Sequence, residues 1–533
     1  MRTMFLNTAS PKSPLLALLL VLPGLLSLTG PLAARQIPTA QRNLFRPAAS
    51  QNPPASVASE QKPPETARPN VLVIMTDEHN FRTLGCYRKR LPRNVANMWG
   101  PAVVETPHID SLAADGAICT SFYATTPVCS PSRAALISGW YPHLTPVHTN
   151  NIPLGDNVLT FAEILKRQGY ATGFAGKWHL DGTAKPGWAP RRKFGFDDNR
   201  FMFNRGHWKI LKLSENGPKV GARNRQGQPS YSVEGATRKT FTTDFLIDRT
   251  VEFIEKKRDT PFCYMVSLPD PHGPDTVRPP YDTMYLKQQY SQPESAKKDF
   301  SNAPSWGQKQ KGGFQQASYY GMVKCIDDNI GKVIACLRQL KIYDNTIIVF
   351  TSDHGDLRGE HHRQNKGVPY EASTRVPFLI RYPGRIDGNT VINQALGSID
   401  FLPTLCNLTG TQAPKEVHGR DFSELLGKRP PDDWEDITIV RGTGDREGWL
   451  MAVSDRYKLV LSARDPIWFF DLQRDPNEMI NLRDHAGYRE TIRTLAGELI
   501  RYGRKHREPF LEQDQIRKDL QWALSSKGSY PGR

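Results

Sequence analysis

Short, largely apolar runs alternate with longer amphipathic stretches along most of the chain. The runs cover residues 71–75, 171–174, 262–266, 346–350 and 376–380. Continuous apolar runs are typical of strands buried on both faces, as in parallel sheets. Apolar positions at helical spacing predict helices between these runs, over 159–168, 243–257 and 318–340. The alternation favours an α/β fold whose large, mostly parallel sheet is covered by helices on both faces.

The pattern changes after about residue 415. Apolar runs over 437–441, 449–453 and 457–461 predict strands separated by turn residues, and a helical pattern follows over 488–502. Such a series favours a small α+β unit built on an antiparallel sheet. We therefore expect a large α/β domain over 69–415, a C-terminal subdomain over 416–515 and a tail over 516–533.

The N-terminal segment has the pattern of a secretory signal. The positively charged Arg2 and Lys12 precede a 14-residue apolar run at 15–28. After this run, Ala33-Ala34 provides a small-residue cleavage site. A membrane-spanning helix needs about 20 residues. This favours a cleaved signal peptide over 1–34, although an uncleaved anchor is the alternative. We expect export to the periplasm or the medium, with no stable membrane anchor.

Residues 35–68 are rich in Pro, Gln, Ala and Ser and lack apolar periodicity, so we expect a disordered linker.

The amino-acid composition limits the classes of partner and of structural motif that fit this chain. The 533 residues carry a formal net charge of +16, which suits anionic partners such as nucleic acid, anionic lipid or acidic polysaccharide. Nucleic acid is not favoured, because the Lys and Arg residues are spread and form no run of five. The seven cysteines include no CxxC pair, which excludes a zinc ribbon or a thioredoxin motif, and they are too few for a disulfide scaffold.

Polar clusters directly follow four of the predicted strands, at 76–80, 175–179, 269–273 and 351–356. Parallel sheets bind ligands at the carboxyl ends of their strands. The carboxylates of Asp77, Glu78 and Asp353 are hard oxygen ligands suited to Ca²⁺ or Mg²⁺, and His354 adds a nitrogen. Considered alone, a hydrated loop without metal explains these residues equally well.

The most specific motif is Cys129-Ser130-Pro131-Ser132-Arg133, followed by Ala-Ala-Leu-Ile-Ser-Gly. The Ser-Pro-Ser step predicts a loop that opens into a helix. Cys129 then lies at the helix N-terminus, where backbone N–H groups favour anions, and Arg133 lies one turn further on. A thiol nucleophile of lowered pKa, or a plain buried cysteine, would fit the same residues.

This motif resembles that of the type I, formylglycine-dependent sulfatases of the alkaline phosphatase superfamily. Further matches follow in family order within residues 69–510: Asp77-Glu78 with 84–87, then 176–180, 352–355, Lys366 before Tyr370-Glu371, and the C-terminal segments 456–459, 470–472 and 475–476. The resemblance implies that a maturation enzyme oxidises Cys129 to Cα-formylglycine. One hydroxyl of its hydrate attacks sulfur, and the second allows sulfate to be expelled.

The resemblance also implies roles for the surrounding residues. The metal, usually Ca²⁺ with Mg²⁺ as an alternative, is ligated by Asp77, Glu78, Asp353, His354 and residue 129. This chain departs from the family at Glu78, where Asp is common, so ligation by the longer side chain is less secure. The His354 position often carries Asn in the family.

The remaining implied roles concern the sulfate group. Arg133 holds the nucleophile and nearby metal ligands, and Lys177 and Lys366 bind sulfate oxygens. His179 deprotonates the hydrate, and His272 protonates or stabilises the leaving oxygen.

We therefore expect an exported sulfatase that hydrolyses sulfate esters, with O-sulfated carbohydrate as the substrate class. A phosphoester or phosphonate hydrolase of the same superfamily, and an unmatured glycan-binding pseudoenzyme, are the alternatives. For His207, Arg191, Arg192 and Arg441, substrate contact and a solvated surface remain equally open. The segment 360–363, with its adjacent histidines, is interpreted as a polar loop rather than a metal site.

Overall fold

The computed structural model describes residues 68–297, 303–308, 315–427, 431, 433–444, 448–525 and 528–532. The predicted signal peptide and residues 35–67 of the predicted linker lie outside these described residues. Within the described ranges, no helix is both long enough and apolar enough to cross a membrane.

The central sheet has eight strands and is mostly parallel, as predicted. In spatial order they are β11 (Thr390–Ile392), β2 (Ala117–Cys119), β10 (Phe378–Arg381), β9 (Thr346–Ser352), β1 (Asn70–Asp77), β8 (Phe262–Pro271), β4 (Ala171–Lys177) and β5 (Asp198–Phe203). All five predicted strands are present. Only β10 runs antiparallel to both of its neighbours, β9 and β2. The short strands β2, β5 and β11 were not predicted.

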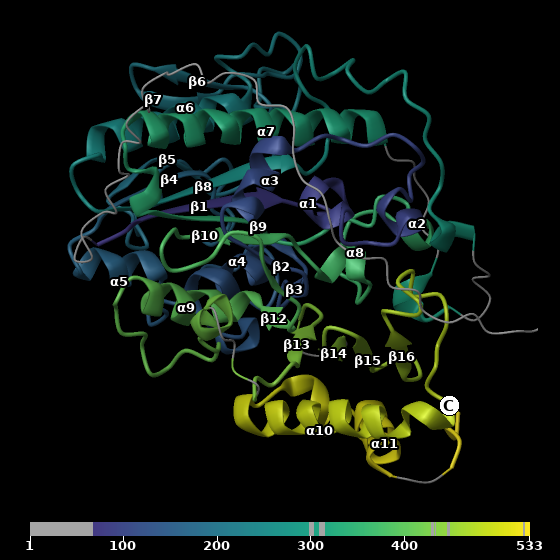
Figure 1. Cartoon of the computed structure of the whole chain (residues 1–533). Helices are drawn as coiled ribbons and strands as arrows, with labels where there is room; N and C mark the ends of the chain where they lie inside the picture. Colours follow the sequence, from purple (N-terminus) through teal and green to yellow (C-terminus); the bar gives the residue numbers. More distant parts are fainter. Residues whose placement is uncertain are drawn as a thin grey trace, which may run out of the picture. The chain divides into compact units, whose positions relative to one another are not determined.

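Helices cover both faces of this sheet (Figure 1). Val71, Val73 and Met75 of β1 pack on one face with α4 (Cys129–Ser138), α5 (Phe161–Arg167) and α9 (Phe401–Leu408). Leu72 and Ile74 point to the opposite face, towards α3 (Pro107–Ala114), α6 (Thr242–Lys257) and α7 (Gln316–Gln339). Because successive side chains of a strand alternate between faces, the continuous apolar run of β1 fills both layers of the core.

Shorter elements complete the large domain. They are α1 (Gly85–Arg88), α2 (Arg93–Ala96), α8 (Glu371–Thr374), the paired strands β3 (Phe122–Tyr123) and β12 (Leu396–Gly397), and the hairpin β6 (Leu211–Ser214) and β7 (Gly217–Val220).

The C-terminal part contains the predicted antiparallel sheet. Its strands lie in chain order: β13 (Thr438–Arg441), β14 (Trp449–Val453), β15 (Tyr457–Ser462) and β16 (Trp468–Asp471). The helices α10 (Arg489–His506) and α11 (Asp514–Leu524) share a core with this sheet (Figure 1). Most of α11 falls in the segment predicted as a tail, yet its Ile516 and Leu520 are buried in that core.

All seven cysteines are buried, unpaired thiols. The structure therefore draws its stability from packing and polar networks rather than from disulfides.

Candidate active site

Five side chains converge at one edge of the central sheet because of where their elements end. Asp77 is the last residue of β1 and Lys177 the last of β4. His272 and Asp353 directly follow β8 and β9. Cys129 is the first residue of α4, which begins as a helix at the predicted loop-to-helix step. The carboxyl edge of the sheet thus gathers the polar clusters that the sequence placed after its strands.

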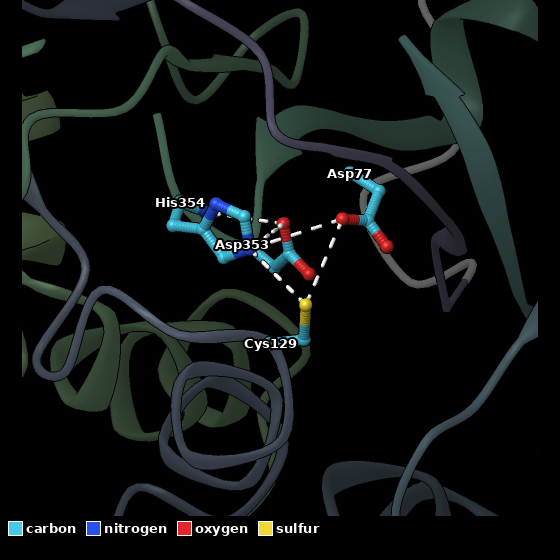
Figure 2. Close-up of side chains that lie close together, drawn as sticks. All are labelled: Asp77, Cys129, Asp353 and His354. Carbon is cyan, nitrogen blue, oxygen red and sulfur yellow. Dashed lines mark hydrogen bonds and ion pairs between the residues drawn. The ribbon is translucent and has the colours of Figure 1, made fainter. Parts of the chain in front are cut away.

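Cys129 lies in a buried cluster with two carboxylates and an imidazole (Figure 2). Its Sγ is 3.2 Å from His354 Nε2 and 3.8 Å from Asp77 Oδ1. One ligand-type atom from each of Asp77, Cys129, Asp353 and His354 lies within 4.8 Å of the others. Lys177 Nζ approaches the sulfur to 3.6 Å. Four of the residues implied as metal ligands are therefore close enough to share one ion.

Arg133 joins the two carboxylates of this cluster. Its Nε donates to Asp353 Oδ2 at 2.9 Å, and a terminal nitrogen donates to Asp77 Oδ2 at 3.1 Å. The other terminal nitrogen donates to the Lys177 carbonyl at 2.6 Å and to Ser267 Oγ at 2.7 Å. The planar guanidinium therefore holds the ends of three strands and the start of α4 in one arrangement.

Two lysines and two histidines form a second layer around the cluster. Lys177 Nζ lies 2.5 Å from Asp77 Oδ2 and 2.9 Å from His207 Nε2. Lys366 Nζ lies 2.9 Å from His272 Nε2. The rings of His207 and His272 stack with their centroids 3.5 Å apart. Cationic and neutral donors thus face the same space as Cys129, an arrangement that suits an anionic substrate group.

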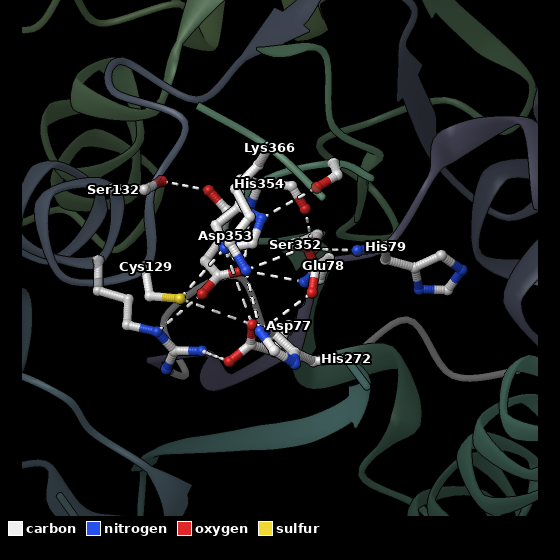
Figure 3. Close-up of polar contacts among 12 residues, drawn as sticks. Asp77, Glu78, His79, Cys129, Ser132, His272, Ser352, Asp353, His354 and Lys366 are labelled. Atoms are coloured by element: carbon white, nitrogen blue, oxygen red, sulfur yellow. Dashed lines mark hydrogen bonds and ion pairs between the residues drawn. The ribbon is translucent and has the colours of Figure 1, made fainter. Parts of the chain in front are cut away.

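Glu78 takes a different position from the other implied ligands. Its backbone has φ 63°, and its amide donates to Asp353 Oδ1 at 3.1 Å. Its carboxylate contacts His272 Nε2 and Lys366 Nζ, each at 3.0 Å (Figure 3). The four-residue cluster around Cys129 does not include it. The structure therefore shows Glu78 as the ion-pair partner of Lys366.

The electrostatics of the site reflect crowding of like charges. Burial and the neighbouring Asp77 raise the pKa of Asp353. Burial alone would raise the pKa of Asp77, but Lys177, His272 and Arg133 hold it below its usual range. Burial and Asp77 also oppose ionisation of Cys129, yet Lys177, Lys366 and His354 lower its pKa to about 6.

Two crowded, buried carboxylates with an imidazole fit a divalent cation, because its charge would offset their mutual repulsion and desolvation.

His179 lies beside the cluster, and both its side chain and its backbone make hydrogen bonds there. Its Nε2 is 3.2 Å from Asn151 Oδ1, and its carbonyl accepts from Ser130 Oγ at 2.8 Å. Burial, followed by the charges of Lys177 and Arg133, lowers the pKa of His179 to about 2. The imidazole is therefore neutral, as a general base must be before it takes a proton, but its low pKa makes it a weak base in this state of the site.

The structure also settles residues that the sequence left open. It places His207 in the site, with a side chain 18% exposed. Arg441 instead pairs with Glu508 and is fully buried, and Arg192 donates to backbone carbonyls of the 154–158 loop.

In the 360–363 segment, where a polar loop was predicted, Glu360–His362 form a largely buried 3-10 helix, in which Glu360 pairs with Arg82 and His361 stacks on Tyr370. Among the described residues, this segment contributes to none of the groups that could hold a metal ion. Asn151 and Ser267 were missed, because no motif marks a single polar residue brought in by a distant loop or strand.

Comparison with known proteins identifies the class. The family model described as Sulfatase matches residues 69–411, and the model described as N-sulphoglucosamine sulphohydrolase, C-terminal, matches 359–505. A similar relative is the ulvan-active sulfatase of Formosa agariphila, 31% identical, with 80% of this chain and 79% of the relative covered. The N-acetylglucosamine-6-O-sulfatase of Bacteroides thetaiotaomicron is 26% identical, with 83% and 87% covered.

Solved structures show the same fold. One, described as a complex with its substrate D-glucosamine-2-N,6-O-disulfate, has a TM-score of 0.68 at 22% identity and covers 85% of this chain and 100% of its own. The phosphonate monoester hydrolase of Agrobacterium radiobacter has a TM-score of 0.64 at 24% identity, with 82% and 96% covered. The chain belongs to the sulfatase family, a family of sulfuric ester hydrolases with the alkaline-phosphatase-like fold.

Proposed function

We propose that this protein is an exported, formylglycine-dependent sulfatase that hydrolyses O-sulfate esters of carbohydrates. The observation that carries the proposal is the position of Cys129. It lies at the N-terminus of α4, within hydrogen-bonding or ion-pairing range of Asp77, His354 and Lys177. A residue so placed meets both the groups that bind a cation and the groups that bind an oxyanion.

The divalent cation and the formylglycine each have a defined place in this proposal. Asp77, Asp353, His354 and residue 129 would hold a divalent cation, with Ca²⁺ or Mg²⁺ proposed from the carboxylates, and the ion would act as a Lewis acid towards a sulfate oxygen. Formylglycine at position 129 would supply, as its hydrate, a hydroxyl nucleophile and a second hydroxyl for product release. Glu78 remains a proposed further ligand.

The protein's own side chains account for binding and proton transfer. Arg133 keeps Asp77 and Asp353 oriented, since it bonds both. Lys177 and Lys366 neutralise charge on the sulfate oxygens. His179, held neutral by burial, takes the proton from the residue 129 hydroxyl in the second step, and His272 stabilises or protonates the leaving oxygen.

The proposal that the substrate is a carbohydrate is supported by the names of two relatives and by the charge of the chain. Two relatives are named for ulvan and for N-acetylglucosamine 6-O-sulfate. The net charge of +16 suits a polyanionic substrate.

The proposal of export depends on the predicted signal peptide over residues 1–34. N-terminal sequencing of protein from the periplasm or medium tests it, and a mature chain that retains residues 1–34 would contradict it.

The central test combines mass spectrometry with turnover. Protein made with a formylglycine-generating enzyme should yield a residue 129 peptide with the mass of the aldehyde or its hydrate, and it should hydrolyse 4-nitrophenyl sulfate. Cys129→Ala should reduce this rate by about three orders of magnitude or more, because no nucleophile remains. Unmodified Cys129 together with no sulfatase turnover would overturn the proposal, and sulfated-glycan binding that survives in Cys129→Ala would then favour the unmatured pseudoenzyme.

Metal analysis tests the ligand set separately. We expect about one divalent ion per chain and loss of turnover on chelation, restored by adding back the same ion. Asp353→Asn should lower the stoichiometry, whereas Asp387→Asn, an exposed position distant in sequence from the site, should not. A transition metal in place of Ca²⁺ or Mg²⁺ would correct the identity of the ion, and full activity without any metal would contradict the site.

A phosphoester or phosphonate hydrolase is the second candidate. It is supported by the TM-score of 0.64 with a phosphonate monoester hydrolase and by a relative, 25% identical, described as a multifunctional alkaline phosphatase superfamily protein from Trinickia caryophylli. Rates on 4-nitrophenyl sulfate, 4-nitrophenyl phosphate and a phenylphosphonate monoester separate the two. A dominant rate on either phosphorus substrate would reverse the assignment.

A further inference from the structure

The side of the site bordered by His207 continues into an aromatic and cationic rim. The His207 ring lies 6.0 Å from the Tyr231 ring, and Tyr231 lies 4.9 Å from Trp208. The ammonium of Lys185 lies 5.0 Å from the centre of the Tyr231 ring and 5.5 Å from that of Trp208. One aromatic ring therefore separates Lys185 from a histidine that contacts Lys177.

The two rings favour one position of this ammonium. A cation over aromatic faces is attracted by the ring quadrupole, which restricts a side chain that would otherwise sample many rotamers. The preceding loop is also fixed, because the buried Asn204 amide donates to the carbonyls of Asp181, Gly182 and Ala184 at 3.0–3.3 Å. Lys185 itself is exposed to solvent. The result is a held but accessible positive charge.

Lys185 differs from the catalytic cations in its partners. Lys177, Lys366 and Arg133 each pair with a carboxylate of the site. Among the ion pairs of the described residues, none involves Lys185. A preorganised cation without a protein counter-charge, beside an opening to solvent at the partly exposed His207, is suited to an anion supplied from outside.

We propose that Lys185, held by Tyr231 and Trp208, binds a second anionic group of the carbohydrate whose sulfate ester enters the Cys129 site. This inference rests on the proposed function. It adds that preferred substrates carry two anionic groups, the second being a sulfate or a carboxylate on the same or the adjoining sugar. Lys185 is thus a specificity residue, and it takes no part in the chemistry at residue 129.

Calorimetric titration of the exported protein in its unmatured Cys129 form, which has no formylglycine to turn the probes over, tests the proposal with defined probes. These are D-glucosamine 6-sulfate, D-glucosamine-2-N,6-O-disulfate, and a sulfated disaccharide that contains a uronic acid. We expect at least one doubly anionic probe to bind about tenfold more tightly than the monosulfate, since a charge-assisted contact has about this effect. The disulfate and the uronic acid probe distinguish sulfate from carboxylate as the second group.

Variants locate the effect. Lys185→Ala should abolish the tenfold preference and leave the monosulfate affinity and the kcat for 4-nitrophenyl sulfate unchanged. Tyr231→Phe, which keeps the ring, should retain the preference. Lys219→Ala, at an exposed lysine of β7, should also retain it. A preference that persists in Lys185→Ala, or that is absent from the unmutated protein, would overturn the proposal. Loss of 4-nitrophenyl sulfate turnover in matured protein would instead count against the proposed function.

Discussion

Buried charges around Cys129 are tolerated because each has a partner of opposite sign. Arg133 contacts Asp77 and Asp353, Lys177 contacts Asp77, and Lys366 contacts Glu78, all within 3.1 Å. A buried ion without a partner costs several kcal/mol, so such a network is sensitive to removal of any single member. Substitutions that keep either the charge or the shape of one side chain should therefore show which of the two properties the site requires.

Arg133→Lys tests the role of the guanidinium fork. A lysine carries the same charge but is a single point donor, and it cannot reproduce bonds to both carboxylates and to Ser267. We expect kcat/KM to fall by about 100-fold and the free energy of unfolding by about 2 kcal/mol. Steady-state kinetics and urea denaturation measure the two effects. Turnover equal to that of the unmutated enzyme would show that positive charge alone suffices at this position.

Glu78→Gln tests whether the carboxylate acts through its charge. The amide keeps a side-chain oxygen at the same distance from the backbone but loses the ion pair with Lys366 and the carboxylate contact with His272, a ring that burial and Lys366 keep neutral by lowering its pKa. We expect kcat/KM to fall about tenfold while metal stoichiometry is retained. The measurements are steady-state kinetics and metal analysis of the purified variant. Loss of the metal in this variant would instead make the charged carboxylate an essential ligand.

At the scale of elements, the C-terminal sheet holds the loop that carries Lys366. Trp449 of β14 donates from Nε1 to the Gly367 carbonyl at 3.2 Å. Lys458 of β15 donates to the Pro369 carbonyl at 3.0 Å and pairs with Glu371 at 2.6 Å. These contacts join the antiparallel sheet to the residues directly after Lys366, so the second sheet positions a group of the active site.

Trp449→Phe removes the indole donor and keeps an aromatic ring in the core. The loop then loses one anchor, and the Lys366 ammonium is held less firmly against Glu78. We expect kcat on 4-nitrophenyl sulfate to fall three- to tenfold with little change in KM, because a poorly placed charge affects the transition state more than ground-state binding. As a control, Trp468→Phe alters an aromatic ring of β16, which lies on the other side of β15 from β14; among the hydrogen bonds of the described residues, none joins the Trp468 indole to this loop. An equal loss in both variants would indicate general destabilisation of the sheet.

Element patterns explain which parts of the fold and site the sequence could predict. Strands such as β1 and β9 were predictable because a buried parallel strand is a continuous apolar run, and Asp77 and Asp353 follow from strand ends meeting at one edge. The direction of β10 was not predictable, since hydropathy is the same for either direction. His207 and Asn151 could not be assigned, because long loops bring them to the site. The direction of the Glu78 side chain depends on its backbone φ of 63°, and the spacing of residues along the sequence does not reveal a backbone angle.

At the scale of the whole described chain, a second cluster of histidines lies outside the group of residues around Cys129. His143 contacts the His506 carbonyl at 2.8 Å, and the rings of His418 and His506 lie 4.9 Å apart. Burial, followed by neighbouring positive groups, lowers the pKa of both His418 and His506 to about 4. His506 is the last residue of α10, so the end of this helix packs against His143 and His418. The fold keeps His418 and His506 neutral.

This cluster predicts a specific loss of stability in acid. Because the folded-state pKa values lie below the ordinary value of 6.5, the unfolded chain binds more protons between pH 6.5 and 4, and the free energy of unfolding falls as the pH falls through this window. Solvent screens part of this effect, so we expect His418 and His506 together to account for a loss on the order of 2 kcal/mol, less than the full amount that the two pKa values imply. Urea denaturation at pH 7.5 and 4.5 should show a smaller difference in a His418→Gln/His506→Gln variant than in the unmutated protein.

The exposed His485 provides the matched substitution, since a His485→Gln variant shows what the replacement of a histidine by glutamine does outside this cluster. Buried carboxyl groups with raised pKa values, such as Glu360 at about 7, act in the opposite direction and are common to all three proteins, so the comparison isolates the histidines. An acid sensitivity that is the same in the double variant would show that protonation of this cluster does not limit stability.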